Sequence, residues 1–205
     1  AAIGTSGTIE RPDFPFESSS SRDVLAIALD QRAGAIRLPV GMRIDLGGIA
    51  KGAFVDSVED LFVDFPGAIV DAGGDLRVWG QPGNEVIWRI GVQHPGVLDA
   101  DIAELQLWAG RPLAVATSSP RSRTWLAGNE RQNHLIDPRT GRAVDSSTPS
   151  VTVVANTVVT AEILAKSILI ASSRGEELPQ AAADLVLIAF EDGRYETIAP
   201  HAAAA

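Results

Sequence analysis

The segment NHLIDPRTG gathers polar side chains around a histidine and a turn. Asp137 precedes a proline, a pairing that starts turns, and Gly141 permits the positive φ that a tight turn needs. Thr140 stands at the expected tip of the turn with its hydroxyl free. His134 lies just upstream, and an imidazole can accept a proton near neutral pH. From this segment alone, His134 is either a general base or a structural histidine at a strand edge.

The segment DLGGIAKG combines a carboxylate, a glycine pair and a lysine. Asp45 is expected at a strand end, and Gly48 in the turn that leads into a helix carrying Lys51. Glycines at a helix start let backbone N–H groups approach an anion, and a lysine adds a point charge there. The alternative is a glycine turn with a solvated lysine. A second glycine pair, in DAGGDLRVWG, is typical of a tight hairpin.

Hydroxyl groups end the strand expected in VATSSPRSR, where Thr117 and Ser118 could hold phosphate or carbonyl oxygens or make an ordinary turn. A hydrolase triad of Ser118, His134 and Asp137 is a further possibility. It is disfavoured because no nucleophile-elbow motif surrounds the serine, and because the histidine and aspartate stand only three residues apart on one local turn.

The segment TAEILAKS places Glu162 and Lys166 four residues apart, on one face of an expected helix. On a surface such a pair contributes only ~0.3–0.5 kcal/mol. The flanking residues are almost wholly apolar, however, which also allows a partly buried site.

The elements that must position these groups follow from the hydrophobic pattern. Helical spacing predicts helices over 48–62 and 160–172. Strands, several of them joined in hairpins, are expected within 24–48, 68–80, 86–95, 102–110, 113–119, 134–138, 150–156 and 183–199. The prediction is an α+β fold with a mostly antiparallel sheet and two main helices, in a single domain over 22–200. Residues 1–21, rich in Gly, Pro and Ser, are expected to form a loop or arm.

The composition narrows the possible partners. The 205 residues carry a net charge of −9, which disfavours nucleic acid and anionic membranes as partners. An anionic ligand must therefore be held by local groups. Cysteine is absent, so thiolate chemistry and disulfides are excluded. No apolar run reaches the ~18–20 residues that span a bilayer.

Taken in order, six segments resemble the ApbE family of FAD:protein FMN transferases. They are DLGGIAKG, DAGGDLRVWG, WRIGVQHP, AVATSS, HLIDPRTG and SVTVVAN with TAEILAKSIL, between Asp45 and Leu169. The resemblance implies binding of FAD with a divalent metal, usually Mg²⁺. It also implies a partner protein whose Ser or Thr hydroxyl attacks the FMN phosphorus, so that AMP leaves. Such phosphoryl transfer depends on positioning, charge neutralisation and deprotonation of the hydroxyl.

The resemblance also assigns roles. His134 matches the probable base, and Gly48 a position whose carbonyl binds metal. The residues matched to the FAD site are Asp45, Lys51, Thr117, Ser118, Asp137 and Thr140.

The chain departs from the family pattern at the metal site, where the family has an aspartate and, four residues later, a threonine. Here those positions hold Glu162 and Lys166. A charged lysine has no acceptor and cannot be a metal ligand. We therefore expect Lys166 to substitute for part of the metal's charge, with Mg²⁺ bound weakly or not at all.

The family's N-terminal Met-Gly-Thr motif also has no counterpart here, which suggests the C-terminal portion of the family domain. Family membership is compatible with the bacterial cell envelope or the cytoplasm. Three functions stay open: flavin transferase, a protein that binds FAD or another adenine nucleotide without transfer, and an inert scaffold.

Overall fold

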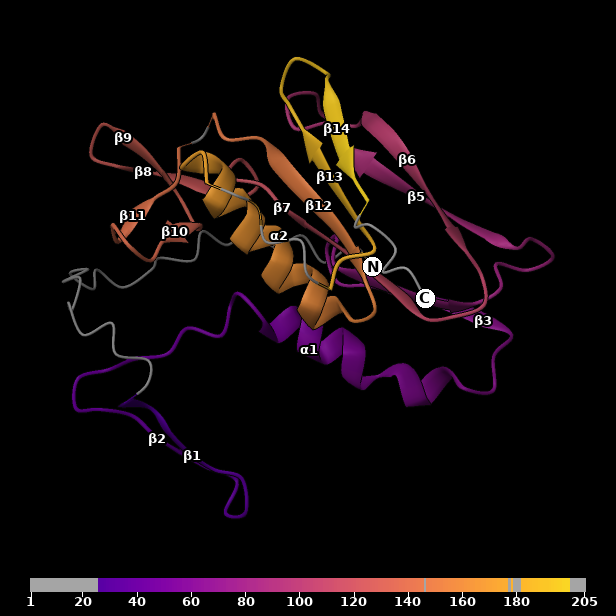
Figure 1. Cartoon of the computed structure of the whole chain (residues 1–205), viewed down its shortest axis with the longest axis horizontal. Coiled ribbons are helices and arrows are strands. Elements are labelled where there is room, and N and C mark those ends of the chain that lie inside the picture. The colour runs from indigo at the N-terminus through magenta and orange to yellow at the C-terminus, as the bar shows by residue number, and fades with distance from the viewer. Residues whose placement is uncertain (1–25, 146, 177, 179–181, 200–205) are drawn as a thin grey trace, which may run out of the picture. The chain divides into compact units, whose positions relative to one another are not determined.

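The computed structural model describes residues 26–145, 147–176, 178 and 182–199 (Figure 1). The arm expected at 1–21 lies outside them. The chain divides into two compact units between Ile44 and Asp45. In the first, strands β1 (Ala28–Asp30) and β2 (Ala35–Arg37) form an antiparallel hairpin. The second contains every candidate site residue.

The second unit is built on a six-stranded sheet with the strand order β14-β13-β12-β7-β4-β3. Every neighbouring pair in it is antiparallel. The strands are β3 (Gly67–Asp71), β4 (Leu76–Gly80), β7 (Leu113–Ser118), β12 (Ser150–Ala155), β13 (Leu185–Ala189) and β14 (Tyr195–Ile198). The expected antiparallel α+β architecture is confirmed.

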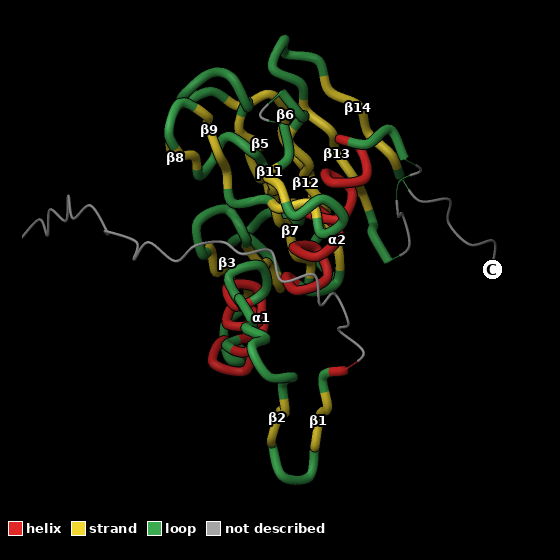
Figure 2. The backbone as a smooth tube through the Cα atoms, turned by 90° about the vertical axis from the view of Figure 1, so that its left-hand side faces the viewer, coloured by secondary structure: helices red, strands yellow, loops and turns green. Residues whose placement is uncertain are grey.

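Apolar cover on both faces of the sheet explains the fully buried central strand β12. Its residues Val151 and Val153 pack with helix α2 (Val158–Ser173), whereas Val154 belongs to a second cluster on the opposite face. That cluster includes Leu105 and Leu107 of the hairpin β5 (Ile87–Gln93) and β6 (Asp101–Trp108). Figure 2 shows α2 beside strands β7 and β12.

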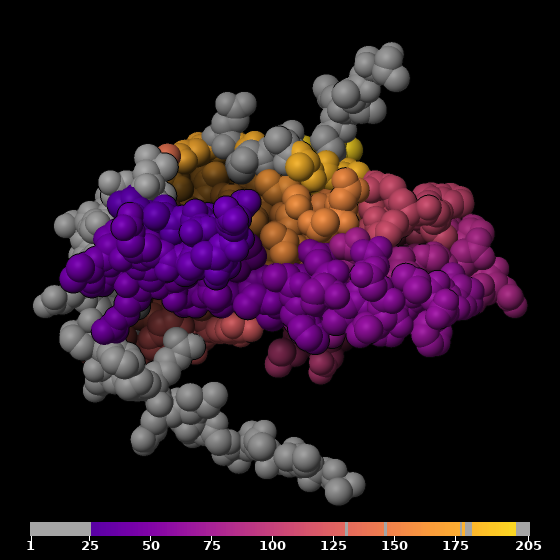
Figure 3. All heavy atoms as spheres, turned by 90° about the horizontal axis from the view of Figure 1, so that it is seen from below, coloured from indigo at the N-terminus to yellow at the C-terminus, as the bar shows by residue number. Residues whose placement is uncertain are grey.

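Two helices pack directly against each other. Helix α1 (Ala50–Ser57) continues into a 3-10 turn, η2 (Glu59–Phe62), so the expected helix over 48–62 is two shorter elements. Thr157 caps α2 by accepting a hydrogen bond from the backbone N–H of Thr160 at 3.1 Å. The surfaces of α1 and α2 adjoin in Figure 3. No helix within the described residues is long and apolar enough to cross a membrane.

The main differences from the expected elements lie near the candidate site. Strands β8 (Thr124–Ala127) and β9 (Glu130–Asn133) form a hairpin that the hydrophobic pattern did not predict. The short strands β10 (Ile136–Asp137) and β11 (Arg142–Ala143) follow it. The strand expected to end at Asp45 is absent, and residues 38–45 form no regular secondary structure.

Candidate functional site

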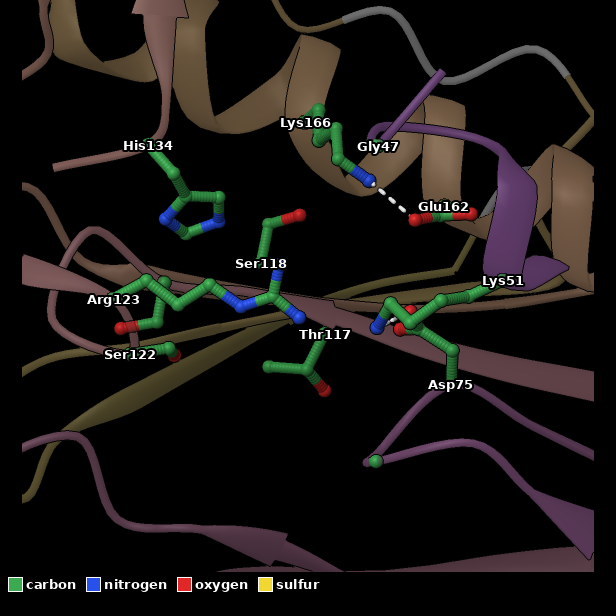
Figure 4. Close-up of a pocket in the computed structure, with 12 residues that line it drawn as sticks. Gly47, Lys51, Asp75, Thr117, Ser118, Ser122, Arg123, His134, Glu162 and Lys166 are labelled. Carbon is green, nitrogen blue, oxygen red and sulfur yellow. Dashed lines mark hydrogen bonds and ion pairs between the residues drawn. The ribbon is translucent and has the colours of Figure 1, made fainter. Parts of the chain in front are cut away.

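A cavity of about 90 Å³ opens where the polar ends of several elements meet (Figure 4). Its walls come from the start of α1, the β3–β4 turn, the end of β7, the segment before β8, the end of β9 and α2. Its charged or titratable lining residues are Lys51, Asp75, Arg123, His134, Glu162 and Lys166. The volume is far below the ~300–1,000 Å³ of pockets for drug-sized ligands. It therefore suits one compact polar group, such as a phosphate, and not a whole dinucleotide.

One wall is an ion pair between α1 and the β3–β4 turn. Lys51 is the second residue of α1, and its Nζ donates to Oδ2 of Asp75. The carboxylate is almost completely buried, whereas the lysine side chain is about one-third exposed and lines the cavity. Because an ammonium has three donors, Lys51 keeps donors for a ligand while it balances Asp75.

The adjoining wall is the pair that α2 presents at i,i+4 spacing. Glu162 is buried, with its side chain 2% exposed, and accepts from Nζ of Lys166 at 2.9 Å. Its other oxygen accepts from the backbone N–H of Gly52 in α1 at 3.2 Å. A Cβ at Gly52 would stand 2.8 Å from that oxygen, so only glycine allows the two helices to approach this closely. This pair is therefore a buried link between helices, and the alternative of an exposed surface pair is wrong.

The end of β7 supplies hydroxyl groups. Ser118 is buried and lines the cavity, as does Thr117, whose Oγ1 lies 2.9 Å from that of Thr152 on β12. Ser119 and the fully buried Pro120 then fix the direction in which the chain leaves the sheet.

His134 follows the last residue of β9 at the base of the β8–β9 hairpin. Thr124 pairs with Asn133, so Arg123 and His134 flank the same end of the hairpin. Burial lowers the pKa of His134, and the charges of Arg123, Lys166 and Lys51 lower it further. A hydrogen bond with the Arg123 backbone acts in the opposite direction. His134 is thus held neutral, the form in which an imidazole accepts a proton.

Three of the predicted cofactor residues do not line the cavity. Asp45 is exposed, and its carboxylate accepts from the backbone N–H of Gly47 at 2.7 Å. Asp137 accepts from the backbone N–H of Arg139 at 2.8 Å, and Thr140 stands on the same exposed turn. Gly48 also lies outside the lining, although Lys166 passes 3.7 Å from where its Cβ would stand.

The hydrolase triad finds no support in this geometry. Ser118 and His134 share the cavity, but Asp137 instead faces Arg174, whose guanidinium lies 3.6 Å from the carboxylate. The aspartate that would have to orient the imidazole is therefore engaged elsewhere.

A family model, that of the ApbE family, matches residues 16–187. The chain belongs to the ApbE family. An FAD:protein FMN transferase of Vibrio cholerae is 32% identical over 158 residues, covering 73% of this chain and 46% of that protein. Another from Rhodobacter capsulatus is 32% identical over 161 residues, covering 74% of this chain and 29% of that protein. The chain spans about half the length of these curated relatives or less.

Solved ApbE structures have the same fold. The ApbE protein of Thermotoga maritima aligns with a TM-score of 0.71 and 32% identity, over 84% of this chain and 56% of that one. The flavin transferase ApbE of Vibrio cholerae aligns with a TM-score of 0.60 and 25% identity, over 87% of this chain and 57% of that one.

The side chains of this ApbE-family member do not fit a Mg²⁺ site. Mg²⁺ requires near-octahedral oxygen ligands. Both carboxylate oxygens of Glu162 already accept hydrogen bonds, and Lys166 brings an ammonium next to them. In the described parts of the chain, no three acidic or histidine side chains are grouped so that they could hold a metal ion.

Sequence reasoning missed Arg123 as a residue of the ApbE-family site. Its guanidinium extends into the cavity between Ser118 and Thr117 (Figure 4). The sequence contains only an indirect indication of this role. Had the hairpin around Gly128 been recognised, its pairing would have put Arg123 opposite His134.

Proposed function

We propose that the chain acts as an FAD:protein FMN transferase. The oxygen of a Ser or Thr hydroxyl on an acceptor protein attacks the FMN phosphorus of FAD. The bond from that phosphorus to the bridging oxygen breaks, and AMP leaves with the electron pair. The hydroxyl proton passes to His134. The products are AMP and a protein that carries FMN through a phosphoester.

The observation that carries this proposal is a histidine that lines one small cavity together with three cationic side chains, those of Lys51, Arg123 and Lys166. The ammonium groups of Lys51 and Lys166 line the same cavity, which supports a role in balancing phosphate charge, and the lowered pKa of His134 favours the neutral form that can act as a base. The names of the relatives, at 32% identity, support the same reaction.

Covalent flavin on acceptor proteins tests the reaction. The chain is incubated with FAD and a protein extract of its source organism, and flavin fluorescence is followed on denaturing gels while AMP release is measured. We expect His134→Ala to bind FAD but to lose ~10²–10⁴-fold in transfer rate, as is typical when a general base is removed. The matched control is His94→Ala, because His94 lies outside the cavity lining and accepts a hydrogen bond from Gly96. Equal transfer by both variants would contradict the role of His134.

A second part of the proposal is that FAD binding does not depend on Mg²⁺. We infer that Lys166 supplies a fixed positive charge at the phosphates, balanced by Glu162, so that FAD binding survives EDTA. Loss of a charge-assisted hydrogen bond costs about 1.5–3 kcal/mol. Lys166→Thr is therefore expected to weaken FAD binding in EDTA by roughly tenfold or more, because it also leaves the negative charge of Glu162 unbalanced. Tight binding that requires Mg²⁺ in the unmodified chain, and that is indifferent to Lys166→Thr, would overturn this proposal.

A second candidate function is FAD binding without transfer. It is favoured by the same pair of residues, because a single ammonium lacks the multidentate clamp that a metal gives phosphoryl transfer. Bound FAD with neither AMP release nor labelled protein would support this function over transfer.

A further inference from the structure

The positive and negative charges of the side chains that line the cavity are unequal in number. Lys51 is paired with Asp75, and Lys166 with Glu162. Arg123 is the third cation in the lining, and within the described residues its guanidinium makes no ion pair with a carboxylate. With His134 neutral, the lining carries one positive charge in excess. That excess belongs to Arg123.

The position of Arg123 does not depend on its side chain. The preceding turn is anchored by the buried Ser118 and Pro120, and the following residue, Thr124, is paired in the β8–β9 hairpin. The exposed guanidinium is thus carried on a fixed backbone and extends into the cavity without a carboxylate to restrain it (Figure 4).

We propose that Arg123 is an anion-binding residue of this site and supplies the charge that captures a phosphate or pyrophosphate group. The proposal rests on the proposed function only for the wider identity of the ligand. Its own claim is that the chemical class bound between Arg123, Lys51 and Lys166 is a phosphate oxyanion.

The chemistry of the three cations favours this division of roles. The guanidinium presents donors in a planar fork that matches two phosphate oxygens, whereas each ammonium acts as a point charge. Each lysine already donates one hydrogen bond to a buried carboxylate. In a chain with a net charge of −9, the long-range field repels an anion. A local unpaired cation is therefore needed to retain it.

Calorimetric titration with inorganic pyrophosphate tests the proposal without requiring any transfer. Hydrogen bonds to charged groups are worth about 1.5–3 kcal/mol, so Arg123→Gln is expected to weaken pyrophosphate binding by roughly tenfold to a hundredfold. The matched control is Arg121→Gln. Arg121 stands two residues away, but it is paired with Glu191 at 2.6 Å and lies outside the cavity lining. The Arg121→Gln variant should bind pyrophosphate as tightly as the unmodified chain.

Two further measurements separate the possible outcomes. Arg123→Lys should recover only part of the affinity, because it restores the charge without the fork. Riboflavin, which has no phosphate, should bind all variants alike if it binds at all. The proposal is overturned if Arg123→Gln binds pyrophosphate normally, or if Arg121→Gln weakens binding as much. Because the probe is pyrophosphate, a failure of flavin transfer leaves this result unaffected.

Discussion

Two charged clusters border the α1–α2 contact, and their charges are balanced in opposite ways. In the first, Arg77 of β4 pairs with both Asp56 and Glu59, and its side chain is 8% exposed. The two oxygens of Asp56 also accept from the backbone N–H groups of Val158 and Val159, at 2.9 and 3.0 Å. In the second cluster, the cavity lining, three cations meet only two carboxylates.

The difference is in how the surplus charge of each cluster is compensated. The surplus negative charge around Arg77 is met internally by the positive N-terminal end of α2. The surplus positive charge at Arg123 has no carboxylate partner among the described residues and faces the cavity. The Arg77 cluster therefore ties parts of the fold together, whereas a ligand anion would complete the cavity cluster under the proposal for Arg123.

The largest expected effect comes from breaking the internally completed cluster. Arg77→Gln leaves Asp56 and Glu59 without their cation, and we expect a loss of about 3 kcal/mol in the free energy of unfolding, the low end for a buried pair. Chemical denaturation measures it. The control is Arg89→Gln, whose partner Glu104 is about half exposed, and which should cost less than about 1 kcal/mol. Equal losses for the two variants would mean that the Arg77 cluster is not a structural tie.

An intermediate effect is expected at Gly52, which lies between the two clusters. A Cβ there would meet Glu162 at 2.8 Å and the α2 backbone at 3.0 and 3.1 Å. Ala gains ~1 kcal/mol over Gly in helix propensity. Overpacking costs ~1–3 kcal/mol, so Gly52→Ala should still be a net loss, of about 1 kcal/mol. It should also weaken pyrophosphate binding, because it displaces Glu162 and with it Lys166.

Gly48→Ala is the matched control. Its Cβ would meet only the flexible side chain of Lys166, at 3.7 Å, an ordinary contact. A change within about ±0.5 kcal/mol is expected. If Gly52→Ala were equally harmless, the close helix contact would not be what holds the Glu162–Lys166 pair in place.

Much of the fold could be predicted because the core elements carry strong hydrophobic patterns. The 160–172 pattern lies wholly within α2, and 150–156 differs from β12 by one residue. The β8–β9 hairpin could not be found in this way, because all residues of β8 are exposed and no alternation of buried and exposed positions marks it. The strand expected before Asp45 was wrongly predicted for the converse reason: the hydrophobic pattern is present, but the residues are not buried. Apolar residues such as Val40 and Ile44 are present there but stay exposed.

Most of the cavity-lining residues that the sequence singled out lie on or beside elements with a clear pattern, whereas His134 was found from its local motif alone. Of the residues that the ordered motifs singled out, Lys51, Thr117, Ser118, His134, Glu162 and Lys166 line one cavity, and their roles there stay predictions. Arg123 was not singled out, because its role depends on strand pairing in the unrecognised hairpin. Asp75 looked like part of a plain turn, and its pairing with Lys51 is a tertiary contact 24 residues apart in the chain.

The smallest expected effect is a shift in the pKa of His134, which responds directly to the surplus positive charge in the cavity. Burial is the first cause of its lowered pKa, and the charges of Arg123, Lys166 and Lys51 come next. In the free protein, the imidazole should therefore titrate below the ordinary histidine value. The measurement is an NMR titration of the Cε1–H resonance, assigned by its disappearance in His134→Gln.

The same titration in variants separates the two causes. If nearby charge contributes, Arg123→Gln should raise the pKa of His134, because a cation that disfavours the imidazolium has been removed, whereas Arg121→Gln should leave it unchanged. Saturating pyrophosphate should raise it as well, since an anion beside the ring favours the protonated form. Burial alone would predict no response to Arg123→Gln. That outcome would remove Arg123 from the electrostatics of the site. A rise with both the variant and the anion would mean that the phosphate which fills the cavity also makes His134 a stronger base when a hydroxyl must be deprotonated.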